Sequence, residues 1–381
     1  MFLRIVSLVL LVTGLALQPA RALETTANMA MVVDYDTGTV LYAKNAERPM
    51  PPASMSKLMT LNMLFEALES GTVSLDDTFL VSAKASQKGG SKMFVREGSR
   101  VRIEDLIRGV IVQSGNDACI VIAEGLAGTE EEFARQMNIR AKELGMLNSN
   151  FANSTGWPGE GQMMSARDLV FIARRIIKEF PEYYKYFAET TFTWDGIVQN
   201  NRNPLLYLDI GADGLKTGHT NEAGFGLVGS AVQDGRRVIF MLGGMDTAAQ
   251  RSSESERITR WAFREFSMQT LFDANQPIDS VRVWLGADDK VEMVLPEEVT
   301  LLLAKSDRDK ITASYTFMDT VEAPVQAGQK LGELTIVIPE RETLTFPLVA
   351  ATSVEAGGFT ERLKAAADIL LNRIRAKTAS L

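Results

Sequence analysis

The chain has 381 residues, of which 46% are apolar, and 40 basic and 48 acidic side chains give a net charge of −8. This charge disfavours a phosphate backbone, so we expect no nucleic acid partner. The chain contains one cysteine, Cys119, and one histidine, His219. It therefore cannot form an internal disulfide or a His-rich zinc site, and we expect neither a metal nor a cofactor. A chain of this length predicts two domains.

The first 22 residues have the features of a secretory signal peptide. Arg4 precedes an apolar run at 5–17, and Ala20-Arg21-Ala22 forms the small-x-small pattern that signal peptidase cuts. An uncleaved membrane anchor is the alternative, but this run is shorter than the about 20 apolar residues that a membrane span needs. We therefore expect residues 1–22 to be removed and the mature chain to begin near Leu23.

The segment 23–274 predicts a mixed α/β domain. Alternating strands at 30–35 and 39–43 flank the turn Asp36-Thr37-Gly38, which is typical of a hairpin. Helical patterns fill the middle of the segment, and strands return near its end. A sheet built from both ends of this domain is therefore expected. The predicted helices lie at 54–68, 103–113, 117–126, 130–144, 166–180 and about 255–266, and the returning strands at 225–233 and 237–243.

The segment 275–352 changes to short alternating runs, which predict a small all-β domain of sandwich type. The expected strands lie at 281–285, 291–295, 300–303, 313–318, 334–338 and 343–349. Residues 353–381 then turn helical. Apolar side chains repeat there at steps of three or four residues, at Phe359, Leu363, Ala366, Leu370 and Ile374.

Ser54 and Lys57 form a Ser-x-x-Lys motif at the start of the helix expected at 54–68, directly after two prolines. Residues three apart lie on one helix face, so the lysine can reach the serine oxygen. Apolar neighbours around this helix would desolvate the ammonium and lower its pKa, which would let Lys57 accept the serine proton. A serine N-cap followed by an exposed lysine is the alternative.

Two further motifs follow in the chain. Ser114 and Asn116 form Ser-Gly-Asn between two predicted helices, where a hydroxyl and an amide could relay a proton and hold a carbonyl. Ordinary turn chemistry also explains this tripeptide. Lys216, Thr217 and Gly218 offer a positive charge, a hydroxyl and room for a ligand backbone beside a strand. Each motif is weak alone, but the three in this order are typical of class A β-lactamases and penicillin-binding proteins.

The chain resembles the low-molecular-mass D-alanyl-D-alanine carboxypeptidases over nearly the whole mature length. Such a resemblance implies a β-lactamase and DD-peptidase type of fold, with an antiparallel sheet flanked by helices and a β-rich C-terminal domain. The segments that carry it are Asp34 to Gly38, Pro52 to Thr60, Leu106 to Gly109, Gln113 to Cys119, Ser165 to Asp168 and Gly214 to Thr220.

The same resemblance implies removal of D-alanine from peptidoglycan stem pentapeptides and covalent inhibition by β-lactams. Ser54 would be the acylated nucleophile, Lys57 its base, and Ser114 with Asn116 the second wall of the cleft. The substrate carboxylate would meet Lys216, Thr217 and Arg251, with Arg202 supporting Lys216. Backbone N–H groups of Ser54 and His219, which follows Gly218, would form the oxyanion hole.

Three alternatives stay open. A β-lactamase shares the nucleophile, but its deacylating Glu-x-x-Leu-Asn pattern is matched here only by Glu143 to Asn148, which is one residue too long. A Ser-His-Asp hydrolase would have to use His219, and Ser54 lacks the Gly-x-Ser-x-Gly elbow. A wall-binding scaffold without activity would not need the intact motifs.

The C-terminal segment 353–381 is basic on an acidic protein, with five cations at Arg362, Lys364, Arg373, Arg375 and Lys377. A basic amphipathic helix is suited to the surface of an anionic bilayer. The resemblance implies the same tether, so we expect a periplasmic enzyme attached to the outer face of the cytoplasmic membrane. A helix docked on the protein's own surface is the alternative.

Overall fold

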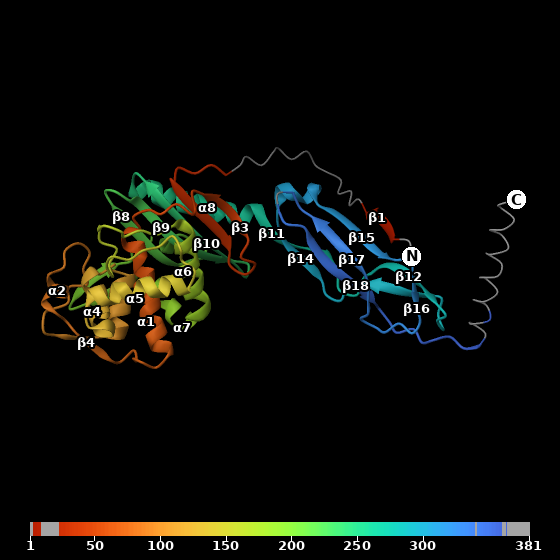
Figure 1. Ribbon diagram of the computed structural model, residues 1–381. Coiled ribbons are helices and arrows are strands. Elements are labelled where there is room, and N and C mark those ends of the chain that lie inside the picture. The colour runs from red at the N-terminus through yellow and green to blue at the C-terminus, as the bar shows by residue number, and fades with distance from the viewer. Residues whose placement is uncertain (1–2, 9–22, 340, 360–362, 364–381) are drawn as a thin grey trace. The chain divides into compact units, whose positions relative to one another are not determined.

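The computed structural model describes residues 3–8, 23–339, 341–359 and 363, and the chain divides into two compact units (Figure 1). One unit is Ala22–Arg264, and the other contains the described residues from Glu265 onward with strand β1 (Leu3–Leu8). The rest of the predicted signal peptide and most of the predicted C-terminal helix lie outside the described residues. No helix in the described ranges has the length and apolar character that crossing a membrane requires.

The larger unit is built on an antiparallel sheet of five strands in the order β3-β2-β10-β9-β8. Two of these strands come from the start of the unit and three from its end. A sheet built from both ends agrees with the sequence prediction, but strand β8 was not predicted. Strand β8 is an edge strand of this sheet and pairs with β9 along one side only. The strands are β2 (Met29–Asp34), β3 (Val40–Lys44), β8 (Ala212–Thr220), β9 (Gly224–Gln233) and β10 (Arg236–Met245).

Alternation along β10 gives the sheet two apolar faces, because successive side chains of a strand point to opposite sides. Phe240 and Leu242 pack in a cluster with Ile258 of α8 (Ala248–Glu265). Ile239 and Met241 join the large cluster that contains the other helices. Helices therefore cover both faces, which explains why the central strands are apolar without interruption.

The remaining helices form the body of this unit, and Figure 1 shows α1, α4 and α5 grouped together. Three of them begin at side-chain caps, since Ser82 accepts from the backbone N–H of Ala85, Thr129 from that of Glu132 and Ser165 from that of Asp168. The α-helices are α1 (Lys57–Glu69), α2 (Ala83–Gln87), α3 (Ile103–Ile111), α4 (Asn116–Ala127), α5 (Glu130–Glu143), α6 (Ala166–Glu179) and α7 (Pro181–Tyr184).

Short elements connect these helices and strands. Four of them form two small ribbons, β4 (Thr78–Leu80) with β5 (Arg100–Arg102) and β6 (Thr191–Trp194) with β7 (Ile197–Asn200). The others are 3-10 turns at η1 (Ala53–Ser56), η2 (Lys185–Ala188) and η3 (Pro204–Tyr207), and a further 3-10 turn, η4 (Lys305–Lys310), belongs to the smaller unit.

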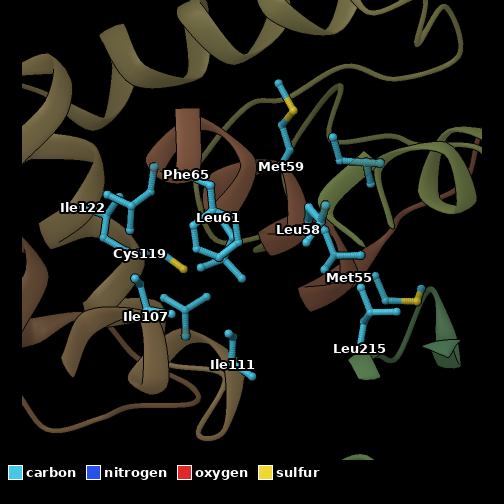
Figure 2. Packing of buried hydrophobic residues seen from close by; sticks show 14 of the residues in the cluster. Met55, Leu58, Met59, Leu61, Phe65, Ile107, Ile111, Cys119, Ile122 and Leu215 are labelled. Carbon is cyan, nitrogen blue, oxygen red and sulfur yellow. The ribbon is translucent and has the colours of Figure 1, made fainter. Parts of the chain in front are cut away.

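Helix α1 passes through the centre of the large core. Figure 2 shows Leu61 and Phe65 of this helix beside Ile107 of α3 and Cys119 of α4. Leu58, Met59, Leu61 and Phe65 are all fully buried. The prediction of a buried helix is therefore confirmed, with its first turn in 3-10 geometry at η1. The first residues of α1 are enclosed, whereas Glu66 and Glu69 near its end reach solvent. Lys57 therefore has no access to bulk water, and this determines its chemistry.

The smaller unit is rich in β-structure, as predicted. A seven-stranded sheet in the order β1-β15-β17-β18-β13-β12-β16 and a two-stranded sheet of β11 and β14 share one apolar cluster, which contains Phe272, Val281 and Leu334. Its strands are β11 (Phe266–Phe272), β12 (Pro277–Trp284), β13 (Lys290–Val294), β14 (Val299–Ala304), β15 (Thr312–Met318), β16 (Thr320–Glu322), β17 (Lys330–Val337) and β18 (Leu344–Ala350).

Strand β11 lies earlier in the chain than the change of sequence texture at residue 275. It pairs antiparallel with β14, so its contacts place 266–272 in the β-rich unit. Phe266 and Phe272 are buried at its two ends, with exposed and partly buried residues alternating between them. The expected helix end at residue 266 agrees with α8, which ends at Glu265.

Candidate active site

Ser54 lies in η1, the 3-10 turn that leads directly into α1 at Lys57. Pro52 precedes this turn with φ −82° and ψ −11°, and Ala53 adopts a positive φ of 48° before the turn closes. The hydroxyl of Ser56 donates to the carbonyl of Ala53 at 3.0 Å and locks this turn. Ser54 is half-buried. Its hydroxyl therefore stands at the N-terminal end of a buried helix, where backbone N–H groups favour negative charge.

Lys57 is fully buried, and three oxygens surround its amine. The Nζ atom lies 2.8 Å from Ser54 Oγ, 2.8 Å from Asn116 Oδ1 and 2.5 Å from the carbonyl oxygen of Thr155. Burial disfavours the charged form and lowers the pKa of Lys57 to about 8. An amine with this pKa is partly neutral near pH 7 and can accept a proton from the serine.

Ser114 and Asn116 come from the tight turn between α3 and α4. Ser114 has a φ of 59°, and Asn116 begins α4. The amide nitrogen of Asn116 donates to the carbonyl of Gly89 at 2.9 Å, which directs the amide oxygen toward Lys57. The turn thus brings the Asn116 amide to the amine of Lys57, 59 residues away in the sequence, and the Ser114 hydroxyl to the amine of Lys216.

Asp117 holds a neighbouring loop against this turn. Its carboxylate accepts backbone N–H groups of Met93, Phe94 and Val95 at 2.9, 2.8 and 3.2 Å. The motif analysis assigned no role to Asp117. Its position directly after the Ser-Gly-Asn motif, in a buried helix start, is the sequence signal that could have identified it.

Lys216 projects from edge strand β8 to the same cleft. Its Nζ donates to Ser114 Oγ at 2.9 Å and to the carbonyl of Thr217 at 3.2 Å. Burial, followed by the positive charges of Lys57 and Arg202, holds the pKa of Lys216 well below its ordinary value. Two buried lysines therefore approach the cleft from opposite sides, one on α1 and one on β8.

Gly218 lets β8 approach the serine turn closely. A Cβ atom there would lie 3.0 Å from the carbonyl oxygen of Pro52 and 3.2 Å from Ala53 Cβ. Thr217 is buried beside it. His219 is exposed, and its ring stacks on Phe225 of β9 with centroids 3.9 Å apart. The Lys-Thr-Gly-His segment therefore lies directly against the turn that carries Ser54.

The two arginines differ in their contacts. Arg202 Nη1 donates to Ser91 Oγ at 2.5 Å, so its side-chain hydrogen bond goes to the loop that contains Ser91 rather than to Lys216. Arg251 lies over the Phe225 ring at 5.7 Å, and its buried Nε has no hydrogen-bond partner among the described residues. Burial and the like charge of Arg202 lower the pKa of Arg251. Neither arginine forms an ion pair within the described chain, so an anion can bind there.

The segment 153–157 is the part of the site that the motifs did not indicate. The carbonyl of Thr155 accepts from Lys57, and Gly156 adopts a φ of +77° so close to the serine turn that a Cβ would meet the Ala53 carbonyl at 1.9 Å. Asn-Ser-Thr-Gly is a turn sequence, which was the available signal. A backbone carbonyl, however, has no residue signature.

Glu143, the nearest candidate for the acidic residue of a β-lactamase, makes no hydrogen bond or ion pair with Ser54, Lys57, Ser114 or Asn116 in the described structure. It ends α5, and its carboxylate accepts from Arg140 Nη1 at 2.8 Å on the surface. Asn148 instead donates to Asp168 and to Glu47. These contacts give Glu143 an ion-pairing role.

Comparison with known proteins matches both units to described families. A family model described as D-alanyl-D-alanine carboxypeptidase matches residues 16–247, and one described as the C-terminal domain of penicillin-binding protein 5 matches residues 266–356. The chain is 37% identical over 349 residues to D-alanyl-D-alanine carboxypeptidase DacD of Escherichia coli strain K12, covering 89% of this chain and 90% of that protein.

Solved structures give the same result. The D-alanyl-D-alanine carboxypeptidase DacD of Francisella tularensis has a TM-score of 0.75 at 31% identity, covering 91% of this chain and 98% of that one. Penicillin-binding protein D2 of Listeria monocytogenes, solved in its ampicillin-bound form, has a TM-score of 0.58 at 31% identity, covering 64% of this chain and 99% of that one. With its motifs, its fold and its relatives in agreement, the chain belongs to the D-alanyl-D-alanine carboxypeptidase family.

Proposed function

We propose that the chain removes the terminal D-alanine from peptidoglycan stem pentapeptides through an acyl-enzyme on Ser54, with Lys57 as the base. The observation that carries this proposal is the 2.8 Å contact between Ser54 Oγ and the buried Nζ of Lys57, whose pKa is lowered to about 8. A serine alcohol is a weak nucleophile until a neighbouring base accepts its proton.

Acylation and hydrolysis then follow in two steps. As the Ser54 proton moves to Lys57 Nζ, the Oγ atom bonds to the carbonyl carbon of the last peptide bond. The C–N bond breaks, and D-alanine leaves after its amine takes up a proton. Water next attacks the ester, the ester C–O bond breaks, and a proton returns to Ser54 Oγ. The Ser114 hydroxyl, which accepts a hydrogen bond from Lys216, would relay the proton to the leaving amine.

Recognition of the substrate depends on β8 and the unneutralised cations. Because β8 is the edge strand of its sheet, an extended peptide can lie alongside it. Lys216, Thr217 and Arg251 offer hydrogen bonds to the terminal carboxylate, with Arg202 adding positive charge. The backbone N–H groups of Ser54 and His219 would stabilise the tetrahedral oxyanion.

β-Lactams are proposed to acylate the same serine. Support comes from the ampicillin-bound form of the Listeria protein. The surface ion pair of Glu143 with Arg140 argues against a β-lactamase, because the nearest carboxylate match is engaged elsewhere. We therefore expect slow release of bound penicillin. A catalytically inactive scaffold would have no need for the aligned Ser54, Lys57, Asn116 contacts.

Export and membrane attachment are proposed as well. The apolar run followed by Ala20-Arg21-Ala22 supports cleavage before Leu23. In the C-terminal segment, Phe359 and Leu363 of the apolar stripe are 81% and 60% exposed. The rest of that stripe lies outside the described residues, and the proposal of a membrane-binding helix is supported by the basic charge and the apolar periodicity of the sequence. The enzyme would then act in the periplasm, held at the outer face of the cytoplasmic membrane.

Replacing the nucleophile tests the mechanism. Ser54→Ala should lower D-alanine release from a stem pentapeptide on the order of 10⁴-fold or more and abolish labelling by fluorescent penicillin. The fold should persist, because among the described residues the Ser54 hydroxyl hydrogen-bonds to Lys57 alone. Ser56→Ala, which alters the neighbouring turn hydroxyl, is the matched control and should retain covalent labelling. Labelling of a folded Ser54→Ala protein would overturn the mechanism.

The pH dependence of acylation tests the base. Only neutral Lys57 can accept the serine proton, so the second-order rate constant for penicillin labelling should rise with pH and level off above about 8. Below that midpoint it should fall about tenfold per pH unit. Stopped-flow labelling between about pH 6 and about pH 10 at constant ionic strength gives the profile. A rate that kept rising toward the ordinary lysine pKa would contradict this assignment.

Truncation tests the tether. Full-length mature protein should co-sediment with anionic vesicles at low salt, while protein ending at Gly358 should stay in the supernatant and keep full carboxypeptidase activity. Salt should weaken the binding, because the attraction is partly electrostatic. Equal pelleting of the two proteins, or equal absence of pelleting, would reject the tether.

A further inference from the structure

The neutral amine of Lys57 must point its lone pair at Ser54 before it can take the proton. An uncharged lysine has two N–H bonds and one lone pair, whereas three oxygens surround Nζ. Two of those oxygens can only accept. The Thr155 carbonyl has no hydrogen, and the Asn116 amide oxygen is turned inward because its nitrogen donates to Gly89.

The third oxygen, Ser54 Oγ, carries a hydrogen and can donate. The arrangement that satisfies all three contacts therefore sends the two N–H bonds to Asn116 and Thr155 and leaves the lone pair facing Ser54. If either acceptor is displaced, the amine can rotate, and an N–H bond can face the serine instead. Proton transfer depends on such alignment.

The Thr155 carbonyl is fixed by the residues before it. The side-chain oxygen of Asn153 accepts the backbone N–H groups of Thr155 and Gly156 at 3.1 and 2.8 Å. The carbonyl of Ser154 accepts from Thr60 of α1 at 2.6 Å. The segment is thus tied to the same helix that carries Lys57.

Glu130 supplies the remaining anchor from α5. Its Oε1 accepts both the hydroxyl and the backbone N–H of Ser154, at 2.8 and 3.2 Å. Its Oε2 pairs with Lys84 at 2.9 Å. Glu130 is 6% exposed. A buried carboxylate with each oxygen engaged is rigidly held, and truncating it would leave both donors of Ser154 without that acceptor.

We propose that Glu130 is a positioning residue for the general base: by fixing Ser154, it holds the Thr155 carbonyl against Lys57 and so keeps the lone pair of the amine directed at Ser54. The proposal rests on the proposed role of Lys57. It extends the active site to α5, a helix that carries none of the three sequence motifs.

Glu131 provides a matched control. It is the next residue of the same helix turn and also pairs with Lys84, at 2.7 Å. Unlike Glu130 it is exposed, and among the described residues its carboxylate hydrogen-bonds to Lys84 alone. Glu130→Ala and Glu131→Ala each remove one partner of Lys84. Only Glu130→Ala removes the acceptor of Ser154.

The experiment measures penicillin acylation against pH in the full mature chain, with the fraction of active sites determined by labelling to completion. Glu130→Ala should lower the high-pH plateau about tenfold, because misalignment slows proton transfer. Its midpoint should move to lower pH, since the ammonium form loses an acceptor that favours it. Glu131→Ala should keep both plateau and midpoint. Glu130→Gln, which retains an acceptor oxygen, should restore the plateau to within about threefold.

Three results would overturn the proposal. One is a Glu130→Ala profile that coincides with that of Glu131→Ala. Another is a loss confined to the fraction of active sites, with unchanged rate and midpoint in the sites that label, which is what a purely structural role predicts. The third is a failure of Glu130→Gln to restore the plateau. Lys57→Ala, measured in parallel, separates the two claims: near-normal acylation by that variant would refute the proposed base itself.

Discussion

The burial of one amine, that of Lys57, is the constraint on which the rest of the site depends. Apolar residues of α3, α4, α5 and α6 pack against α1, so the amine cannot be solvated by bulk water and its pKa falls to about 8. A buried polar group must still be hydrogen-bonded. Each oxygen around Nζ comes from a different segment of the chain, and the large core holds these segments together.

A second buried lysine gives the cleft its electrostatic character. Lys216 lies on the sheet side and forms no ion pair with the described residues. Arg202 and Arg251 add positive charge nearby. Such a set of unneutralised cations is unfavourable in isolation. A substrate that ends in a carboxylate would relieve this repulsion, so the same feature that strains the free protein favours binding of a C-terminal peptide anion.

The sequence predicted those features that depend on local pattern. Periodicity identified strands β2, β3, β9 and β10, helix α1 and most strands of the β-rich unit, but not edge strand β8. The three motifs named Ser54 and Asn116, which contact Lys57, and Ser114, which contacts Lys216. The sequence could not identify the Thr155 carbonyl, because any residue carries a carbonyl and only the fold decides where it points. Strand β11 was missed because its partner β14 lies about 30 residues ahead. The contact of Arg202 with Ser91 likewise depends on loop placement.

The boundary between local and tertiary information also explains Glu130. A glutamate in the first turn of a helix is common, since carboxylates favour that position. Its buried contact with Ser154 spans 24 residues and becomes visible only in the folded chain. Pattern reasoning therefore finds the reacting groups, whereas the groups that aim them are found from the structure.

The titration of the Lys57 side chain tests the central claim most directly. Lysine labelled with ¹³C at Cε and ¹⁵N at Nζ, with Lys57→Arg to assign the resonance, allows the amine to be followed by NMR as pH changes. The account predicts a midpoint at about 8, set by burial. A midpoint at the ordinary lysine value of 10.5 would contradict it, because the amine would then be protonated when the serine reacts.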